Sequence, residues 1–270
     1  MKAKKFLTMA ALTMGLAMTG AMMTSCSNQD NPTVGPIEGN PPSPKGKTVV
    51  LSELSEDYVA VDGDMLTGPI KEKHKISIAD GATVTLSIVY IDGGITCLGD
   101  ATIILADDNT VNGLDEGQPG IQAGGMGTTL TIRGEKNSTG KLSATGGFGA
   151  AGIGSRAEGS CGDITIVGGV IEATGGSYAA GIGSGERGRC GKITIRKPAT
   201  GTAKGGKNSP SAIGAGEEGE CGEISVDKDS IISVDDSNVD PNGGGGGDGP
   251  DVDPNGGGGG DGPASDDRPV

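Results

Sequence analysis

The sequence contains very few bulky aromatic residues. Among 270 residues there are no Trp, three Tyr and two Phe, so that aromatic residues make up 2% of the chain. This scarcity disfavours a conventional globular core and a sugar-binding platform built from several aromatic rings. Gly supplies 54 residues, about three times its average share, without the Gly-X-Y period of collagen. We therefore expect a thin fold in which small residues lie where backbone segments crowd together.

The chain also has little histidine and fewer positive than negative charges. His74 is the one His in the sequence, so a metal site built from several His residues is excluded. A Ser-His catalytic pair would have to use His74. Asp and Glu number 35 against 21 Lys and Arg, which gives a net charge of −14. A chain of this charge repels the phosphate backbone, so we expect no nucleic-acid partner.

The N-terminal segment has the pattern of a secretory signal. Three Lys precede an apolar run that ends in Met23-Thr24-Ser25-Cys26. An ordinary signal with an incidental Cys is one interpretation. The segment also resembles a bacterial lipoprotein signal, although Met23 stands where Leu is usual. That resemblance implies that residues 1–25 are removed and that acyl chains on Cys26 hold the protein to a membrane. The expected location is extracytoplasmic, at the outer membrane or cell surface rather than the inner membrane.

Composition divides the remaining chain into three parts. Residues 26–46 contain five Pro and predict a lipid-anchored, semi-stiff tether. Residues 236–270 repeat a Val-Asp-Pro-Asn-Gly motif followed by runs of Gly, and we expect them to be disordered. In this tail Asp251, Asp253 and Asn255 match the first half of a calcium loop, but Gly262 stands where the loop needs Glu. They are a weak candidate calcium site; otherwise we expect no cofactor.

Residues 47–235 form an internal repeat. Cys161, Cys190 and Cys221 recur at nearly equal spacings, and each precedes a short alternating strand such as Ile164-Thr165-Ile166. One unit buries too few large aliphatic side chains to offset the entropy of ordering its backbone, so that units must stack on one another. The pattern predicts an all-β fold, a single-stranded parallel β-helix with coils of about 29–31 residues, preceded by an N-terminal cap at Thr48–Ile70.

Charges in the repeat are consistent with stacking in register. Aligned positions read Glu158, Arg187 and Glu218 in one column. A second column, Asp163, Lys192 and Glu223, shows the same alternation. Opposite charges on adjacent parallel strands avoid repulsion and help to fix the register.

Two sequence features carry a resemblance to known proteins. They are the run Ile76–Leu86 followed by Gly94–Leu105, and the recurring motif A-G-I-G-S…C-G-x-I-T-I. The chain resembles bacterial surface lipoproteins of the right-handed parallel β-helix group, and is distantly similar to the carbohydrate-binding β-helix family related to pectate lyases. The resemblance implies a right-handed solenoid. It implies no catalytic residue, because no lyase active-site motif matches this sequence.

Two groups of residues are candidate ligand contacts. Hydroxyl side chains should align on one outer face and could bind sugars or order water: Thr131, Thr165, Thr194 and Ser225. Basic side chains crowd one coil and could meet an acidic glycan: Arg187, Arg189 and Lys192. The alternatives are a plain β-branched strand surface for the first group and ion pairs between coils for the second.

The column of Cys161, Cys190 and Cys221 has three interpretations. It is a ladder of small, buried, reduced side chains, a disulfide with one thiol left over, or a metal site. Each Cys is separated from the next by a whole repeat unit, which is unlike the close spacing of paired zinc ligands.

The sequence thus leaves three functions open. The first is a membrane-anchored, non-enzymatic binding or adhesion module for a polysaccharide or host glycan. The others are an enzyme of the polysaccharide-lyase type and a structural spacer without a ligand.

Overall fold

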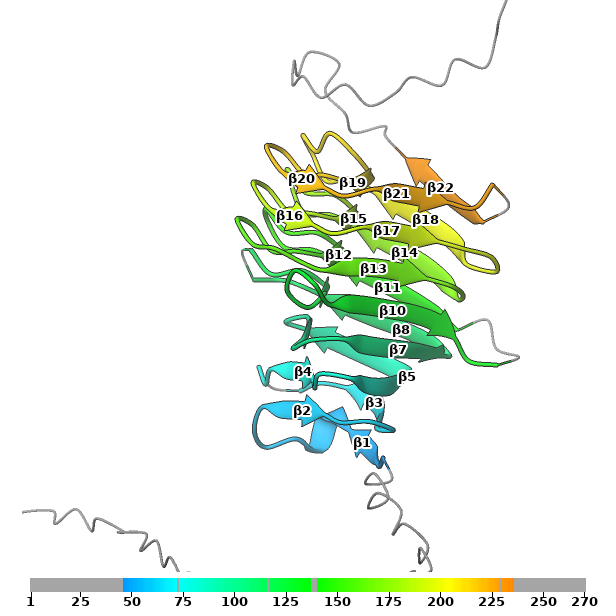
Figure 1. Ribbon diagram of the computed structural model, residues 1–270. Coiled ribbons are helices and arrows are strands. Elements are labelled where there is room, and N and C mark those ends of the chain that lie inside the picture. The colour runs from blue at the N-terminus through cyan, green and yellow to red at the C-terminus, as the bar shows by residue number, and fades with distance from the viewer. Residues whose placement is uncertain (1–45, 72, 116, 137–139, 229, 236–270) are drawn as a thin grey trace, which may run out of the picture. The chain divides into compact units, whose positions relative to one another are not determined.

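The computed structural model describes residues 46–235, apart from 72, 116, 137–139 and 229 and apart from the side chains of 231–235. The predicted signal, Cys26, the tether, the tail and the candidate calcium residues lie outside the described residues. The described part is built from parallel strands in curled sheets and contains one short 3-10 helix, η1 (Leu51–Glu53) (Figure 1). It is a parallel β-helix, as the repeat predicts. None of the described helices is long and apolar enough to cross a membrane.

Each full coil passes through three faces. Face 1 is defined by the first half of β5 (Ala82–Asp92) and by β7 (Ala101–Ala106), β10 (Thr129–Gly134), β13 (Asp163–Ile166), β17 (Ile193–Ile195) and β21 (Ile224–Val226). Face 2 is defined by the second half of β5 and by β8 (Asp108–Asn112), β11 (Lys141–Thr145), β14 (Val170–Thr174), β18 (Thr200–Lys204) and β22 (Ile231–Asp235).

Face 3 is a separate seven-stranded sheet. Its strands are β2 (Tyr58–Ala60), β4 (Ile76–Ile78), β6 (Ile95–Cys97), β9 (Ile121–Gln122), β12 (Ile153–Gly154), β15 (Ile182–Gly183) and β19 (Ile213–Gly214). Beside it, β16 (Arg189–Cys190) and β20 (Glu220–Cys221) form a two-stranded sheet in the loops that lead from face 3 to face 1.

Strand β5 explains why faces 1 and 2 belong to one sheet. Its residues 82–87 pair with β7 and its residues 90–92 pair with β8, and the chain turns at Ile88, which has a φ of 57°. In later coils two separate strands replace the single bent one. Strand β3 (Met65–Pro69) also crosses this corner, since it pairs with β5 on both sides of Ile88.

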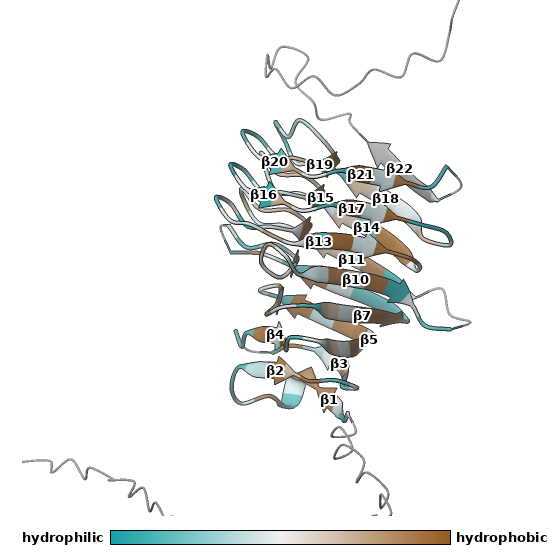
Figure 2. Cartoon of the chain, in the orientation of Figure 1, coloured by the Kyte–Doolittle hydropathy of each residue, from teal (hydrophilic) through white to brown (hydrophobic). Residues whose placement is uncertain are grey.

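The core consists of aliphatic columns that run from coil to coil. On face 1 one column contains Val84, Ile103, Ile132, Ile166 and Ile195, all fully buried and in register. Figure 2 shows hydrophobic residues, in brown, recurring along these strands and hydrophilic residues, in teal, in many of the loops beside them. A fully buried side chain of this size contributes about 1.5–3 kcal/mol. Stacking therefore supplies the core that a single coil lacks.

Coil length changes along the solenoid. From β13 onward it is nearly constant, since Ile164 pairs with Ile193 and Ile193 pairs with Ile224. Near the N-terminus the coils are much shorter, since Ala82 already pairs with Ala101. The difference lies in the loops, because the longer coils extend both the loop from face 2 to face 3 and the loop from face 3 to face 1 that contains the Cys column. The repeat is visible in the sequence only where these loops are present.

The segment Thr48–Ile70, expected as an N-terminal cap, is part of the solenoid itself. Strand β1 (Thr48–Val50) pairs with β3 (Met65–Pro69), and β3 pairs with β5. The segment is tied together by Asp64, which is 1% exposed. Its carboxylate accepts hydrogen bonds from the Tyr58 hydroxyl at 2.6 Å and from the backbone N–H groups of Lys47 and Val61 at 2.9 and 3.1 Å.

The recurring Ile-Gly of face 3 has a steric cause. Gly183 has a φ of 138°, and a Cβ atom there would lie 1.9 Å from the carbonyl oxygen of Gly214 in the next coil. Gly154 stands in the same relation to Gly183. Side chains cannot be accommodated at these positions, so the motif marks a place where the backbones of successive coils approach too closely for a Cβ atom.

Candidate ligand-binding face

A ladder of hydroxyl side chains runs along the outside of face 1. The strand register places six residues in one column: Thr83, Thr102, Thr131, Thr165, Thr194 and Ser225. The structure thus aligns the four hydroxyl residues expected from the sequence and extends the column by two at its N-terminal end. They point outward because side chains alternate along a strand, and their neighbours such as Ile164 and Ile166 point into the core.

The ladder is held on a rigid support. Its strands lie in the parallel sheet, so that successive hydroxyl groups recur at about 4.8 Å, the spacing of neighbouring strands. The first four members are half-buried, Thr194 is 8% exposed, and Ser225 is exposed. Accessible hydroxyl groups therefore concentrate in the coils from Thr83 to Thr165 and again at Ser225.

A row of carboxylates ties the coils together at the start of face 1. Asp80 accepts a hydrogen bond from the backbone N–H of Asp100 at 2.8 Å, and Asp100 accepts one from Thr129 at 2.7 Å. Asp163 accepts one from the N–H of Lys192 at 2.8 Å. Each acid therefore binds the coil that follows it. This fixes where the hydroxyl ladder begins in each coil.

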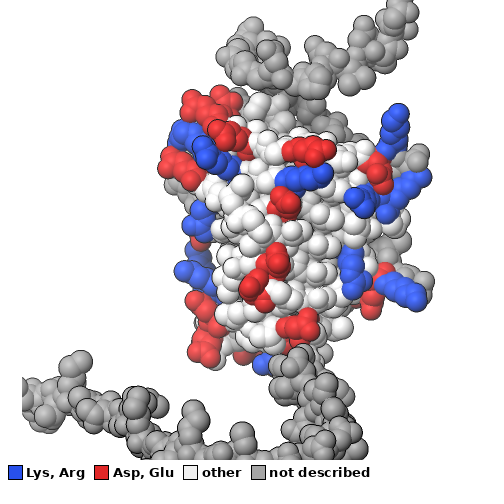
Figure 3. Space-filling view, viewed as in Figure 1, with Lys and Arg blue, Asp and Glu red and all other residues white. Residues whose placement is uncertain are grey.

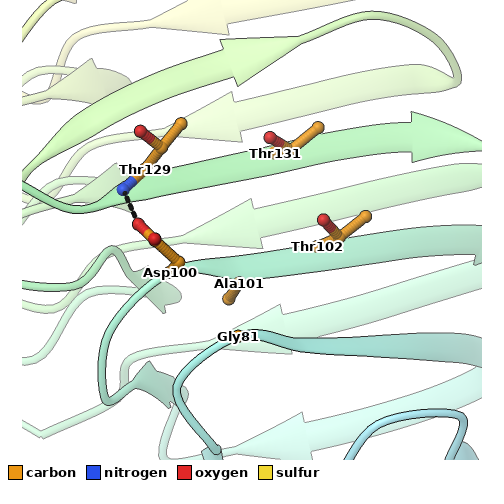
Figure 4. A pocket seen from close by; sticks show the side chains of 6 residues that line it. All are labelled: Gly81, Asp100, Ala101, Thr102, Thr129 and Thr131. Atoms are coloured by element: carbon orange, nitrogen blue, oxygen red, sulfur yellow. Dashed lines mark hydrogen bonds between the residues drawn. The ribbon is translucent and has the colours of Figure 1, made fainter. Parts of the chain in front are cut away.

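A shallow depression lies beside the ladder at these acids. Its volume is about 220 Å³, and it is lined by Gly81, Asp100, Ala101, Thr102, Thr129 and Thr131. Figure 4 shows Thr102 and Thr131 side by side on adjacent strands, with Asp100 bonded to the backbone nitrogen of Thr129. The lining offers hydroxyl groups and one carboxylate. Such groups donate and accept hydrogen bonds to a polyhydroxylated ligand.

The three predicted basic residues lie against acids of neighbouring coils or of their own loop. Arg187 contacts Glu158 at 2.9 Å and Glu186 at 2.7 Å, Arg189 contacts Glu220 at 3.3 Å, and Lys192 contacts Glu223 at 2.9 Å. The hydrogen bond to Glu158 and the nearby acids raise the pKa of Arg187. Arg187 and Arg189 lie in the loop between β15 and β17 rather than in the hydroxyl ladder.

The charged groups at the start of face 1 are mostly acidic: Asp80, Asp100, Asp163 and Glu223 lie there together with Lys192. Figure 3 shows a broad uncharged surface on this side, crossed by a narrow row of charged groups and bordered by charged loops. The alternation Asp163, Lys192 and Glu223, expected from the sequence, is present as a hydrogen bond followed by an ion pair. Screened by solvent, such exposed pairs contribute little to stability.

The sequence analysis missed one pair of residues. The rings of Phe148 and Tyr178 lie 5.7 Å apart in an edge-to-face arrangement, and Phe148 is 51% exposed. They come from adjacent coils, at the corner between face 2 and face 3. Both residues follow a Gly-Gly pair in the loop before face 3, but Tyr178 stands one position later in its loop than Phe148. Aligning the repeats therefore does not put the two rings at one position, and the available signal was only that both lie in the same loop.

The Cys column is also brought together. Cys190 pairs with Cys221 in register, and the sulfur atoms of Cys161 and Cys190 lie 2.8 Å apart. Within the part of the chain that the structure describes, no group of three His, Cys, Asp or Glu residues is arranged to hold a metal ion.

The fold and this face define a parallel β-helix that presents a regular hydroxyl ladder. In comparisons with protein-family models, curated proteins and solved structures, no match to the chain was found. The interpretation of its function therefore depends on the geometry described above.

Proposed function

We propose that this protein is a non-enzymatic binding module that holds an extended glycan along face 1. The observation that supports the proposal is the in-register column of six hydroxyl side chains. A polysaccharide is itself a repeating array of hydroxyl groups, and one sugar unit of an extended chain is similar in length to the spacing between coils. The ladder therefore offers repeated contacts to a repeated ligand.

The energetics favour such an array. One hydrogen bond exchanged against water contributes about 0.5–1.5 kcal/mol net, so a single hydroxyl contact binds weakly. Several contacts on one rigid surface add up, because the side chains are already held by the sheet and little ordering cost remains on the protein side. The depression at Thr102 and Thr131 is the part of the ladder where a sugar ring can be partly enclosed.

The charge distribution favours a neutral glycan over an acidic one. Arg187, Arg189 and Lys192 lie against Glu residues, and the depression itself contains the carboxylate of Asp100. The chain as a whole carries a net charge of −14. A polyuronate would be repelled by these acids, whereas a neutral polymer would not.

A glycan array followed by titration calorimetry on the hit tests this proposal. We expect one or more neutral polysaccharides to bind to the full chain. The variant combining Thr102→Val, Thr131→Val and Thr165→Val removes three hydroxyl groups while it keeps β-branched side chains. It should weaken binding at least tenfold.

Thr174→Val is the matched control, because Thr174 is half-buried on β14 of face 2, and it should leave affinity unchanged. Equal binding by the triple variant would contradict the proposal. Release of unsaturated products from a polyuronate would replace it with the lyase alternative.

We also propose that the domain is anchored to the outer surface of a bacterial membrane through Cys26. The support is the sequence motif alone. Labelling of cells with an alkyne fatty acid should tag the wild-type protein and not Cys26→Ser. Protease digestion of intact cells should then degrade the anchored domain, and protection from protease would contradict the surface location.

A further inference from the structure

Three cysteines of successive coils lie in one column. The parallel bridge of Ser160 with Arg189 and the pairing of Cys190 with Cys221 put Cys161, Cys190 and Cys221 at equivalent positions. The sulfur atoms of Cys161 and Cys190 are 2.8 Å apart, about 0.8 Å more than the length of a disulfide bond. Neighbouring strands lie about 4.8 Å apart, within the Cα separation that a disulfide spans.

The column has a graded exposure to solvent. Cys161 is fully buried, Cys190 is 5% exposed, and Cys221 is half-buried. In the described part of the chain β16 is bridged on its other side by Ser160, whereas β20, which carries Cys221, pairs with β16 alone. A reagent in solution therefore reaches the column from the Cys221 end.

Cys190 occupies the central place in this arrangement. It contacts Cys161 on one side and is paired in register with Cys221 on the other. Three sulfurs can form only one disulfide at a time, and both available pairs contain Cys190. Transfer of a disulfide between them needs three sulfur atoms in a row, with the attacked sulfur in the middle.

We propose that the Cys161–Cys190–Cys221 column is a thiol–disulfide exchange site that accepts a disulfide at Cys221 and passes it inward to Cys161–Cys190. The oxidant is an external disulfide of a small thiol or of a protein. This inference is independent of glycan binding.

The exchange balances in three steps. The Cys221 thiolate attacks the external disulfide, forms a mixed disulfide and releases one external thiol. The Cys190 thiolate then attacks the Cys221 sulfur, forms Cys190–Cys221 and releases the second external thiol. Finally the Cys161 thiolate attacks Cys190 and frees Cys221 as a thiol. Overall, two protein thiols become one disulfide, and one external disulfide becomes two thiols.

The environment makes this exchange slow at neutral pH. The hydrogen bond with Cys161 and burial raise the pKa of Cys190, and the hydrogen bond with Cys190 and burial raise that of Cys221. Because the thiolate is the nucleophile, the rate should increase about tenfold for each pH unit between pH 7 and pH 9. We therefore expect the three thiols to stay reduced at neutral pH and to react with an added disulfide at alkaline pH.

Mass spectrometry of the full, reduced chain incubated with oxidised glutathione at pH 8.5 tests the proposal. The wild-type protein should lose two hydrogens, and peptide mapping should find Cys190 in the disulfide, joined to Cys161. Cys190→Ser should stop at glutathione bound to Cys221, with no internal disulfide. Cys221→Ser should oxidise at least tenfold more slowly.

Cys97→Ser is the control, since Cys97 is buried on β6 of face 3, and it should behave as wild type. Mapping of the wild-type protein does not depend on how well any variant folds. The proposal is overturned if the wild-type chain stays reduced, if it accumulates only the Cys221 adduct, or if the internal disulfide omits Cys190.

Discussion

The carboxylate of Asp100 accepts a hydrogen bond from the backbone N–H of Thr129, 2.7 Å away and one coil later. The same relation links Asp80 to Asp100 and Asp163 to Lys192. A side chain of one coil thus satisfies a backbone donor of the next at the edge of the ladder. This relation makes the register of the candidate binding face depend on individual acids.

Replacing Asp100 tests this dependence. We expect Asp100→Ala to lower the free energy of unfolding by about 0.5–1.5 kcal/mol, since a hydrogen bond is lost at an exposed site. Asp100→Asn keeps a carbonyl acceptor and should lose less. Urea unfolding followed by circular dichroism measures both variants, and an equal loss in both would show that charge, not the acceptor, matters.

The aliphatic column should dominate stability. Ile166→Ala leaves a cavity among fully buried side chains, and we expect a loss of about 2–5 kcal/mol. The neighbouring Thr165→Ala changes an outward side chain on the same strand and should cost less than about 1 kcal/mol. Thermal or chemical unfolding of the pair measures the difference. Similar losses in both would contradict the assignment of the inner and outer sides of β13.

Close approach at face 3 makes a separate prediction. Gly183→Ala puts a Cβ atom where a carbonyl oxygen lies and forces a positive φ on Ala, so we expect a loss of about 3 kcal/mol or more. Gly125→Ala is the matched control, because nothing lies within 4 Å of a Cβ atom there. Soluble yield and melting temperature of the two variants provide the readout, and a stable Gly183→Ala protein would refute the packing.

Asp64 should make the N-terminal coils sensitive to acid. Burial raises its pKa, but the hydrogen bonds from Tyr58, Lys47 and Val61 outweigh this effect, and the pKa is lowered overall. A carboxyl group with a lowered folded-state pKa contributes stability above its unfolded value of about 3.9, and the contribution is lost as the pH falls through the folded value. We expect the unfolding free energy of wild type to drop between pH 5 and pH 2.

The variant Asp64→Asn should reduce this loss of unfolding free energy at acid pH, which we call the acid limb. Urea titrations at several pH values measure it.

Tyr58 should produce a loss of unfolding free energy at alkaline pH. Burial and the hydrogen bond with Asp64 raise its pKa to about 12, so its contribution is present below pH 10 and is lost as the pH rises toward 12. Tyr58→Phe should abolish this alkaline loss and should also reduce the acid limb, because it removes a hydrogen bond that lowers the pKa of Asp64. An unchanged acid limb in Asp64→Asn would exclude Asp64 as its source.

The sequence by itself determined the architecture from Cys161 onward. A repeat of nearly constant length, with alternating Ile-Thr-Ile strands and Gly pairs, is compatible with stacked coils and with little else. It also aligned Thr131, Thr165, Thr194 and Ser225, because a column of equivalent repeat positions becomes a column in space once coils stack.

Only the tertiary structure decided the rest. Thr83 joins the ladder from a shorter coil, 19 residues before Thr102, so that the longer repeat does not align it. Thr102 stands 29 residues before Thr131, but the sequence between them lacks the recurring Cys motif that marks the repeat. Phe148 and Tyr178 meet because two corners lie on top of each other, one coil apart. Stacking of the coils also places Arg187 against Glu158 and Lys192 against Glu223, so that these basic side chains form ion pairs within the protein. Local sequence fixes which way a side chain points, whereas the offset between coils fixes which side chain it meets.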